Sequence, residues 1–351
     1  MESLQGVALN LCNYRHFSEH LAPICILLHI PLLLSELAEA EFLEKIYPGL
    51  KTEVWQGETL SLSRLLETFS LLIQSEYWPR KKWEEAKIRY GNRSNKPHHL
   101  HCPHGFSDKR FWLAQAAQEE GTLYYGLLMQ TWLREEGMEE TRQIWCGNYR
   151  ACYYQKYRDQ MDAFCEENVL SRFKKKQFCI LYAPTCLDQE LSTTFFETKD
   201  LLDHLPPEYN LLVKLHPALV EKAPWEVEEL ILSYSGRPNL LILDQFPLVY
   251  PILQHMDVYV GDVSSMGYDF LNLGKPMFFL KNRQNRPPRL LEKAGCSLPV
   301  EKASLIYSLL DKQPDVSVQK HLYQQAFGPT LSWEELASCL TTQITMWFNL
   351  C

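Results

Sequence analysis

Histidine, serine, threonine and lysine residues recur in four short segments, in patterns suited to binding a phosphate and moving a proton. Hydroxyl groups, N–H groups at a helix start and lysine ammonium groups are common phosphate partners. Imidazole suits proton transfer because its ordinary pKa lies near neutrality. The sequence therefore predicts a cradle for a phosphate group. The residues are His104, Gly105, Lys109, Thr185, Lys214, His216, Ser264 and Ser265.

Each of these residues also has an ordinary structural interpretation. Asp262 or Ser264 would cap the helix that carries Tyr268 and Asp269. Gly105 would serve a turn, because glycine adopts a positive φ at no steric cost. Thr185 and His216 would be loop residues. The phosphate interpretation depends on the segments taken together.

Apolar runs typical of buried strands precede these segments. Such runs occupy residues 178–182, 211–215, 240–243, 257–260 and 277–280, and helical stretches separate most of them. This alternation predicts a doubly wound α/β domain with a parallel sheet. Ligands bind beyond the carboxyl ends of the strands in such sheets, which is where Thr185, His216 and the serine pair fall.

The first half of the chain shows a weaker form of the same pattern. His20–His29 predicts a short buried helix and Ile30–Leu34 a strand, although the reverse order remains open. Ser35 predicts an N-cap for a helix that ends near Pro48. Residues 51–56 predict a strand, and the leucine spacing in 59–75 predicts one amphipathic helix.

A polar, basic stretch then precedes a histidine-rich strand. Residues 78–97 are polar and basic, and their end at 92–97 has the composition of a loop. His98–Cys102 predicts a strand that runs into the turn Pro103-His104-Gly105. We expect an N-terminal α/β domain over 1–172 and a C-terminal α/β domain over 173–320. Residues 321–351 predict a helical segment that packs back on the first domain.

Composition limits the class of protein. The chain has 351 residues, 46% of them hydrophobic and 22% charged, with a net charge of −8. This is typical of a two-domain globular protein and disfavours a duplex nucleic-acid binder, which needs a basic surface. Eleven cysteines without a CxxC pair indicate reduced thiols, most of them in the core.

The first thirteen residues lack the features of a secretory signal, so we expect a cytoplasmic protein. The most apolar stretch, Leu21–Leu34, is too short to span a bilayer, which needs roughly twenty residues. Peripheral attachment at the inner face of the plasma membrane, through a basic and aromatic patch, remains open. A solvated helix face is the favoured interpretation of that patch. Its members are Trp78, Arg80, Lys81, Lys82 and Trp83.

Four motifs, in order, resemble the CDP-glycerol glycerophosphotransferase family, which polymerises or primes teichoic-acid-type poly(glycerol phosphate). They are HGFSDK (104–109), YAPT (182–185), KLHP (214–217) and DVSSMGYDFLNLGKP (262–276). The resemblance implies a GT-B-like fold of two facing Rossmann-type domains with parallel sheets and an interdomain cleft. It also implies transfer of a glycerol-phosphate-type group from a CDP-linked donor to an acceptor hydroxyl, with release of CMP, for a cell-envelope polymer.

The resemblance also assigns roles. His104 would be the general base, and His216 would contact the donor pyrophosphate and stabilise the leaving CMP. Ser264, Ser265 and Thr185 would bind donor phosphate, and Lys109 and Lys214 would add positive charge. Gly105, Asp262 and Asp269 would support the site. Val263 and Cys186 depart from the family pattern, and the N-terminal domain, which would hold the acceptor, has no clear match. The acceptor, lipid-linked or not, and the donor alcohol therefore stay open.

A GT-B glycosyltransferase or nucleotide-sugar epimerase using a UDP- or CMP-linked sugar is the main rival, and a catalytically inactive nucleotide-binding or scaffold protein is a second. We expect no cofactor. The residues His98, His99, His101, His104 and Cys102 lack the usual zinc-ligand spacing. The sequence contains no G-x-S-x-G serine-hydrolase motif and no Walker A motif.

Overall fold

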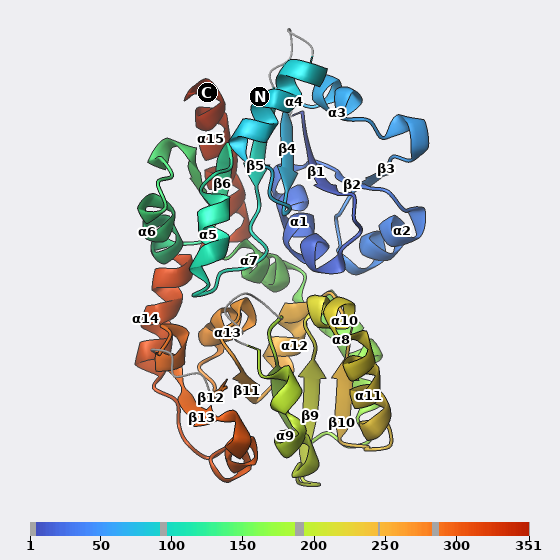
Figure 1. Ribbon diagram of the computed structural model, residues 1–351, viewed down its shortest axis with the longest axis vertical. Coiled ribbons are helices and arrows are strands. Elements are labelled where there is room, and N and C mark those ends of the chain that lie inside the picture. The colour runs from blue at the N-terminus through green and yellow to red at the C-terminus, as the bar shows by residue number, and fades with distance from the viewer. Residues whose placement is uncertain (1–4, 92–96, 187–192, 245, 283–287, 351) are drawn as a thin grey trace. The chain divides into compact units, whose positions relative to one another are not determined.

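The computed structural model describes residues 5–91, 97–186, 193–244, 246–282 and 288–350. These residues form two compact units (Figure 1). Unit 1 comprises residues 1–105, 109–158 and 325–351, and unit 2 comprises 106–108 and 159–324. The helical C-terminal segment lies with the first unit, and the short piece 106–108 lies with the second.

Unit 1 is built on a seven-stranded sheet in the order β3-β2-β1-β4-β5-β6-β7. All its strands run parallel, as the alternation of strands and helices predicted. The strands are β1 (Gly6–Asn10), β2 (Leu32–Leu34), β3 (Thr52–Val54), β4 (Leu71–Gln74), β5 (His98–His101), β6 (Gly121–Tyr124) and β7 (Gln143–Trp145).

The helices of unit 1 pack in groups. Helices α1, α7 and α15 contact one another, α3 contacts α4, and α5 contacts α6. Their bounds are α1 (Arg15–Leu28), α2 (Leu37–Ile46), α3 (Leu62–Thr68), α4 (Arg80–Tyr90), α5 (Arg110–Ala116), α6 (Leu127–Glu135), α7 (Tyr149–Lys156) and α15 (Trp333–Leu350).

Several sequence predictions for unit 1 need correction. Residues 59–75 are not one helix: α3 ends at Thr68, and the buried run Leu71–Gln74 is strand β4. Strand β1 was not predicted. Residues 80–90 form α4, which agrees with the helical interpretation of the basic patch. Of the predicted loop 92–97, residues 92–96 lie outside the described residues. Ser35 does not cap the next helix, because its hydroxyl donates to the carbonyl of Leu11. The strand at 51–56 and the strand at 98–102 are confirmed.

Unit 2 contains a six-stranded sheet in the order β10-β9-β8-β11-β12-β13, again all parallel. Its five predicted strands are confirmed, and β13 is additional. They are β8 (Phe178–Ala183), β9 (Tyr209–Lys214), β10 (Leu240–Leu243), β11 (Val258–Gly261), β12 (Met277–Lys281) and β13 (Cys296–Pro299).

Short helices connect the strands of unit 2. Four of them are α10 (Pro217–Lys222), α11 (Pro224–Tyr234), α12 (Val249–His255) and α13 (Ser265–Phe270). The longer helix α8 (Arg158–Asn168) leads into the unit, and α14 (Val316–Phe327) leads out of it. Buried aliphatic residues of β8, β9 and β11 contribute to the hydrophobic core of unit 2.

Helix α15 packs closely against the start of β6 in unit 1. A Cβ atom on Gly121 would lie 2.6 Å from Cζ2 of Trp347, whose side chain is buried. The indole ring is rigid, and it fits there because Gly121 has no side chain. The C-terminal segment is therefore fitted to this part of the sheet.

We predict that Gly121→Ala lowers the free energy of unfolding by about 1–3 kcal/mol through overpacking against Trp347. Chemical denaturation followed by tryptophan fluorescence measures the change. Gly236→Ala is the control, because a Cβ there meets nothing within 4 Å. Equal stability of the two variants would contradict the close packing.

Candidate functional site

Each sheet has one point where the strand order reverses. In unit 1 this point lies between β1 and β4, and in unit 2 it lies between β8 and β11. Beyond the carboxyl ends of the strands, such a reversal leaves a crevice where open α/β sheets bind ligands. The segments after β8 and β11 contain Thr185 and residues 262–265. Strand order thus places these predicted site residues at the switch point of unit 2.

Asp262 joins the two loops at this switch point. Its side chain is fully buried, and its Oδ1 accepts the N–H of Thr185 at 2.9 Å. Its Oδ2 accepts the N–H of Thr194 at 3.0 Å. The carboxylate therefore fixes the backbone after β8 to the backbone after β11. The interpretation of Asp262 as a helix cap is wrong.

The serine pair follows Asp262 directly. Ser264 is the N-cap residue of α13 but makes no side-chain capping bond. Its Oγ lies 3.1 Å from the hydroxyl of Tyr259, and both serines are half-buried. Gly261 makes room for this tyrosine, because a Cβ there would lie 2.5 Å from its hydroxyl. Sequence reasoning missed Tyr259, which as part of an apolar strand carried no signal.

His216 follows β9, the strand next to β8. It caps α10, and its Nδ1 accepts the N–H of Ala218 at 3.1 Å. An Nδ1 that accepts cannot carry the proton of a neutral ring, so the proton lies on Nε2. His216 is therefore set up as a hydrogen-bond donor through Nε2. Lys214, the last residue of β9, is nine-tenths buried.

Asp269, like Asp262, is a buried carboxylate. Its Oδ1 accepts the hydroxyl of Tyr250 at 2.7 Å. The preceding residue, Tyr268, donates to the carboxylate of Asp108. Asp108 also accepts the N–H of Leu291 at 3.1 Å. The FSD part of the HGFSDK motif is thus anchored inside unit 2, a role that the sequence did not predict.

In unit 1, His104 lies on a turn after β5. Gly105 has a φ of 112°, a conformation that favours glycine. The hydroxyl of Tyr125 donates to the carbonyl of Pro103 at 2.7 Å and accepts the N–H of Gly105 at 3.2 Å. Tyr125 thus holds the backbone on both sides of His104. No sequence pattern linked it to the motif, since it lies twenty residues further along the chain.

The imidazole of His104 is surrounded by aromatic rings. Its centroid lies 5.4 Å from that of Phe17 and 6.0 Å from that of Trp112. Burial lowers the pKa of His104 to about 4, so the ring is neutral at physiological pH. Nδ1 of His104 is buried and has no hydrogen-bond partner among the described residues. Because Nδ1 is buried, a ligand would contact the ring through Nε2. Lys109, by contrast, is a buried residue at the start of α5.

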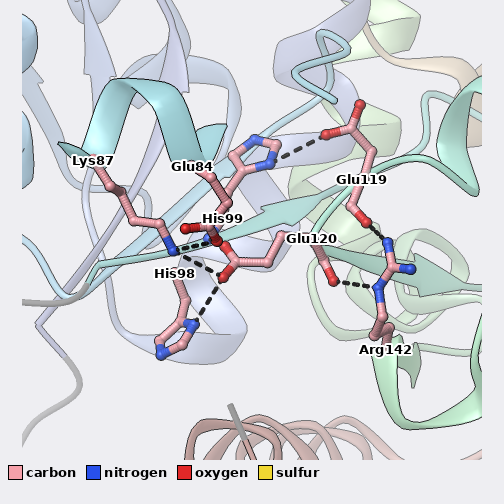
Figure 2. Close-up of polar contacts among 7 residues, drawn as sticks. All are labelled: Glu84, Lys87, His98, His99, Glu119, Glu120 and Arg142. Atoms are coloured by element: carbon pink, nitrogen blue, oxygen red, sulfur yellow. Dashed lines mark hydrogen bonds and ion pairs between the residues drawn. The ribbon is translucent and has the colours of Figure 1, made fainter. Parts of the chain in front are cut away.

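His98 and His99, upstream of His104, contact buried glutamates. His98 and Lys87 both contact Glu120 Oε1 at 3.3 Å (Figure 2). Burial alone would raise the pKa of Glu120, but these partners and the His99 N–H hold it below its usual value. His99 Nδ1 lies 3.2 Å from Glu119 Oε2. These contacts gather at the amino ends of β5 and β6, away from the edge of the sheet that carries His104.

Within the described part of the chain, no three histidine, cysteine, aspartate or glutamate side chains are arranged to hold a metal ion. The cysteines there are free thiols, and half of them are buried. Trp83, a member of the basic and aromatic patch, is fully buried, so it cannot contribute to a membrane-binding surface. None of the described helices is both long and apolar enough to cross a bilayer.

Comparison with known proteins extends the resemblance noted in the sequence. Residues 152–285 match the family described as CDP-Glycerol:Poly(glycerophosphate) glycerophosphotransferase. Over this segment, the chain is similar to the glycerophosphotransferase family. The segment contains the switch point of unit 2, including His216, Asp262 and the serine pair. It does not contain His104.

The curated relatives are distant. The teichoic acid glycerol-phosphate primase of Bacillus spizizenii is 34% identical over 102 residues, which is 28% of this chain and 24% of the relative. The match thus spans about a quarter of that protein's length. The similarity to the family is limited to the matched segment, and the activity of the whole chain is a separate question.

Solved structures confirm the GT-B-like fold. The wall teichoic acid polymerase TagF, in a variant soaked with CDP-glycerol, matches with a TM-score of 0.66 and 12% identity, over 99% of this chain and 89% of that one. The UDP-GlcNAc 2-epimerase of Neisseria meningitidis, bound to UDP-GlcNAc, matches with a TM-score of 0.56 and 11% identity, over 97% and 99%. Two activities share this fold, so the fold does not choose between them.

We predict that Asp262→Asn loosens the loop after β8. The amide has only one oxygen, so the N–H of Thr185 or that of Thr194 loses its acceptor, at a cost of about 1–3 kcal/mol. Hydrogen exchange at residues 183–186 and 193–195, together with thermal unfolding, measures the effect.

Asp203→Asn is the control for this substitution, because Asp203 is a surface aspartate that bonds only the Tyr234 hydroxyl among the contacts described. If Asp262→Asn leaves exchange at the two threonines as slow as in the control, Asp262 is not what holds the loop.

Proposed function

We propose that this chain transfers a glycerol-phosphate-type group from a CDP-linked donor to an acceptor hydroxyl and releases CMP. The observation that carries the proposal is the switch point of unit 2. There, His216 presents a protonated Nε2, and the half-buried serines follow the bracing Asp262. This arrangement lies within the segment that matches the glycerophosphotransferase family.

Unit 2 supplies the contacts for the donor in this proposal. The Nε2–H of His216 donates to a diphosphate oxygen, and the hydroxyls of Ser264 and Ser265 donate to others. Thr185 and Lys214 lie at neighbouring strand ends, but both are buried, so their contribution is to the shape and charge of the site. Hydrogen bonds to a charged phosphate are stronger than those between neutral groups, so a few donors suffice.

The chemical step is a substitution at phosphorus. The acceptor oxygen forms a bond to the phosphorus that carries the glycerol, and the bond from that phosphorus to the bridging oxygen of CMP breaks. The proton of the acceptor hydroxyl passes to Nε2 of His104, whose neutral ring is ready to accept it. Charge that develops on the departing CMP is stabilised by His216. Such reactions depend mainly on positioning and electrostatic stabilisation.

The low pKa of His104 has a consequence for this role. A base whose conjugate acid has a pKa of about 4 is weak, and catalysis is most efficient when that pKa lies near the working pH.

A sugar-transferring or epimerising enzyme is the rival, since the epimerase fold also matches. It would use a UDP-linked substrate in place of a CDP-alcohol. An inactive nucleotide-binding protein is the second alternative. Three measurements distinguish these functions: CMP release from CDP-glycerol, UDP release from UDP-sugars, and formation of an epimeric UDP-sugar.

We predict that His104→Ala lowers the rate of CMP release from CDP-glycerol by at least about 100-fold, the contribution of a general base, with donor affinity near that of the wild type. His216→Ala should instead weaken donor binding by about tenfold or more, since it removes a charge-assisted hydrogen bond. Product chromatography and calorimetry report the two effects separately.

His204→Ala is the matched control, because His204 is an exposed histidine of unit 2. Loss of donor affinity in His104→Ala would contradict the division of roles. Release of UDP from UDP-sugars, with none of CMP from CDP-glycerol, would favour the rival. No turnover and no binding with either donor would favour the inactive protein.

A further inference from the structure

Unit 2 has a pocket at the amino ends of its strands. It has a volume of about 380 Å³, which lies in the range of small-ligand sites, roughly 300–1,000 Å³. The pocket is formed by the end of α11, the loop that follows it, the start of β10 and the segment that leads into β8. Its described lining residues all belong to unit 2. They are Arg172, Lys174, Ile231, Tyr234, Ser235, Gly236, Arg237, Pro238, Leu240, Leu241 and Ile242.

This pocket is separate from the candidate site. Because the sheet is parallel, the amino ends of its strands lie at one edge and the carboxyl ends at the opposite edge. The pocket is lined by residues before β8 and at the start of β10. His216 and the serine pair follow β9 and β11. A small ligand in this pocket is therefore a second ligand, distinct from the donor proposed above.

Three cationic side chains give this pocket a single sign of charge. They are Arg172, Lys174 and Arg237, and none of the lining residues that the structure describes is acidic. The neighbouring Lys176 pairs with Glu166 at 2.8 Å. Within the described part of the chain, no ion pair involves the three lining cations. A concave site lined by one sign of charge concentrates ions of the opposite sign, so the pocket favours an anion.

Arg237 is held in place by unit 2 itself. Its guanidinium donates to the carbonyl of Leu202 and lies 5.9 Å from the centre of the Tyr234 ring. The hydroxyl of Tyr234 donates to Asp203 at 2.6 Å, and Asp203 does not line the pocket. A guanidinium has five N–H groups, so the bond to Leu202 leaves others for a ligand.

The segment that carries the other two cations is also ordered. The N–H of Arg172 donates to the carbonyl of Val169 at 3.1 Å. The side-chain amide of Asn210, on β9, donates to the carbonyl of Lys175 at 2.8 Å. These bonds fix the backbone on both sides of Lys174, while Arg172 and Lys174 themselves are exposed. A backbone fixed before binding lowers the entropic cost of holding a ligand.

The rest of the wall is largely apolar. Leu240, Leu241 and Ile242 of β10 and Ile231 of α11 line it beside the cations. An inorganic anion would leave this surface in water, whereas an organic ester would cover it. A phosphate carries about two negative charges at neutral pH, and arginine binds its oxygens in pairs. Cations beside an apolar wall therefore fit a phosphate that carries an organic group.

We propose that this pocket binds a phosphate ester, with the phosphate on the three cations and the organic group against β10. The proposal does not rest on the transfer reaction proposed above. Two sources carry this chemistry, a free ester in solution and the headgroup of an anionic lipid. The test separates them.

Calorimetry on the full chain uses phenyl phosphate, inorganic phosphate and hexaglutamate as probes. Co-sedimentation uses vesicles of phosphatidylcholine with and without phosphatidylglycerol. The test variant combines Arg172→Gln with Lys174→Gln, two exposed positions at which the fold should tolerate the change. The control variant combines Lys302→Gln with Lys312→Gln. These are exposed lysines of the same unit outside the pocket, so both variants lose the same charge.

We predict that the test variant binds the phosphate ester at least tenfold more weakly than the wild type. The control variant and His216→Ala should keep wild-type affinity, and CDP-glycerol should bind the test variant as it binds the wild type. A free ester as the natural ligand predicts that phenyl phosphate binds in solution, more tightly than inorganic phosphate. A lipid headgroup predicts binding to phosphatidylglycerol vesicles without binding of phenyl phosphate.

Equal affinity of the test and control variants for phenyl phosphate and for phosphatidylglycerol vesicles would overturn the proposal. So would the absence of binding to both in the wild type. Tighter binding of hexaglutamate than of either phosphate probe would also overturn it, because the pocket would then be a docking site for an acidic peptide.

Discussion

The buried carboxylate of Asp262 is the interaction on which the candidate site depends. Taking a carboxylate out of water is costly unless hydrogen bonds compensate, and here two backbone N–H groups do so, those of Thr185 and Thr194. These threonines belong to the segment after β8, whereas Asp262 follows β11, so the carboxylate connects the two segments at the switch point. The hydrogen bonds of Asp262 also fix the backbone that leads into Ser264 and Ser265.

The two histidines of the proposed reaction are positioned by hydrogen bonds in which backbone groups take part. The N–H of Ala218 sets the tautomer of His216. Tyr125 holds the carbonyl before His104 and the N–H after it. Each imidazole is thus placed by the turn that carries it, and each turn follows a parallel strand. This explains how two units of different sequence both present functional groups at the carboxyl ends of their sheets.

The sequence predicted unit 2 better than unit 1 because its strands are continuous apolar runs, such as Phe178–Ala183. The leucine spacing of 59–75 fitted a helix only because α3 runs directly into the buried strand β4, and periodicity alone cannot separate the two. The motifs identified His216 and the serines. Tyr125 could not be found, since its importance arises from hydrogen bonds to Pro103 and Gly105 that only the fold makes possible.

The central claim is that the switch point of unit 2 holds the diphosphate of a CDP-linked donor. A crystal structure of the chain soaked with CDP-glycerol tests it most directly. We expect diphosphate oxygens within about 3 Å of His216 Nε2 and of the Oγ of Ser264 or Ser265. Density for the diphosphate elsewhere on the chain, with His216 and both serines out of its reach, would contradict the claim.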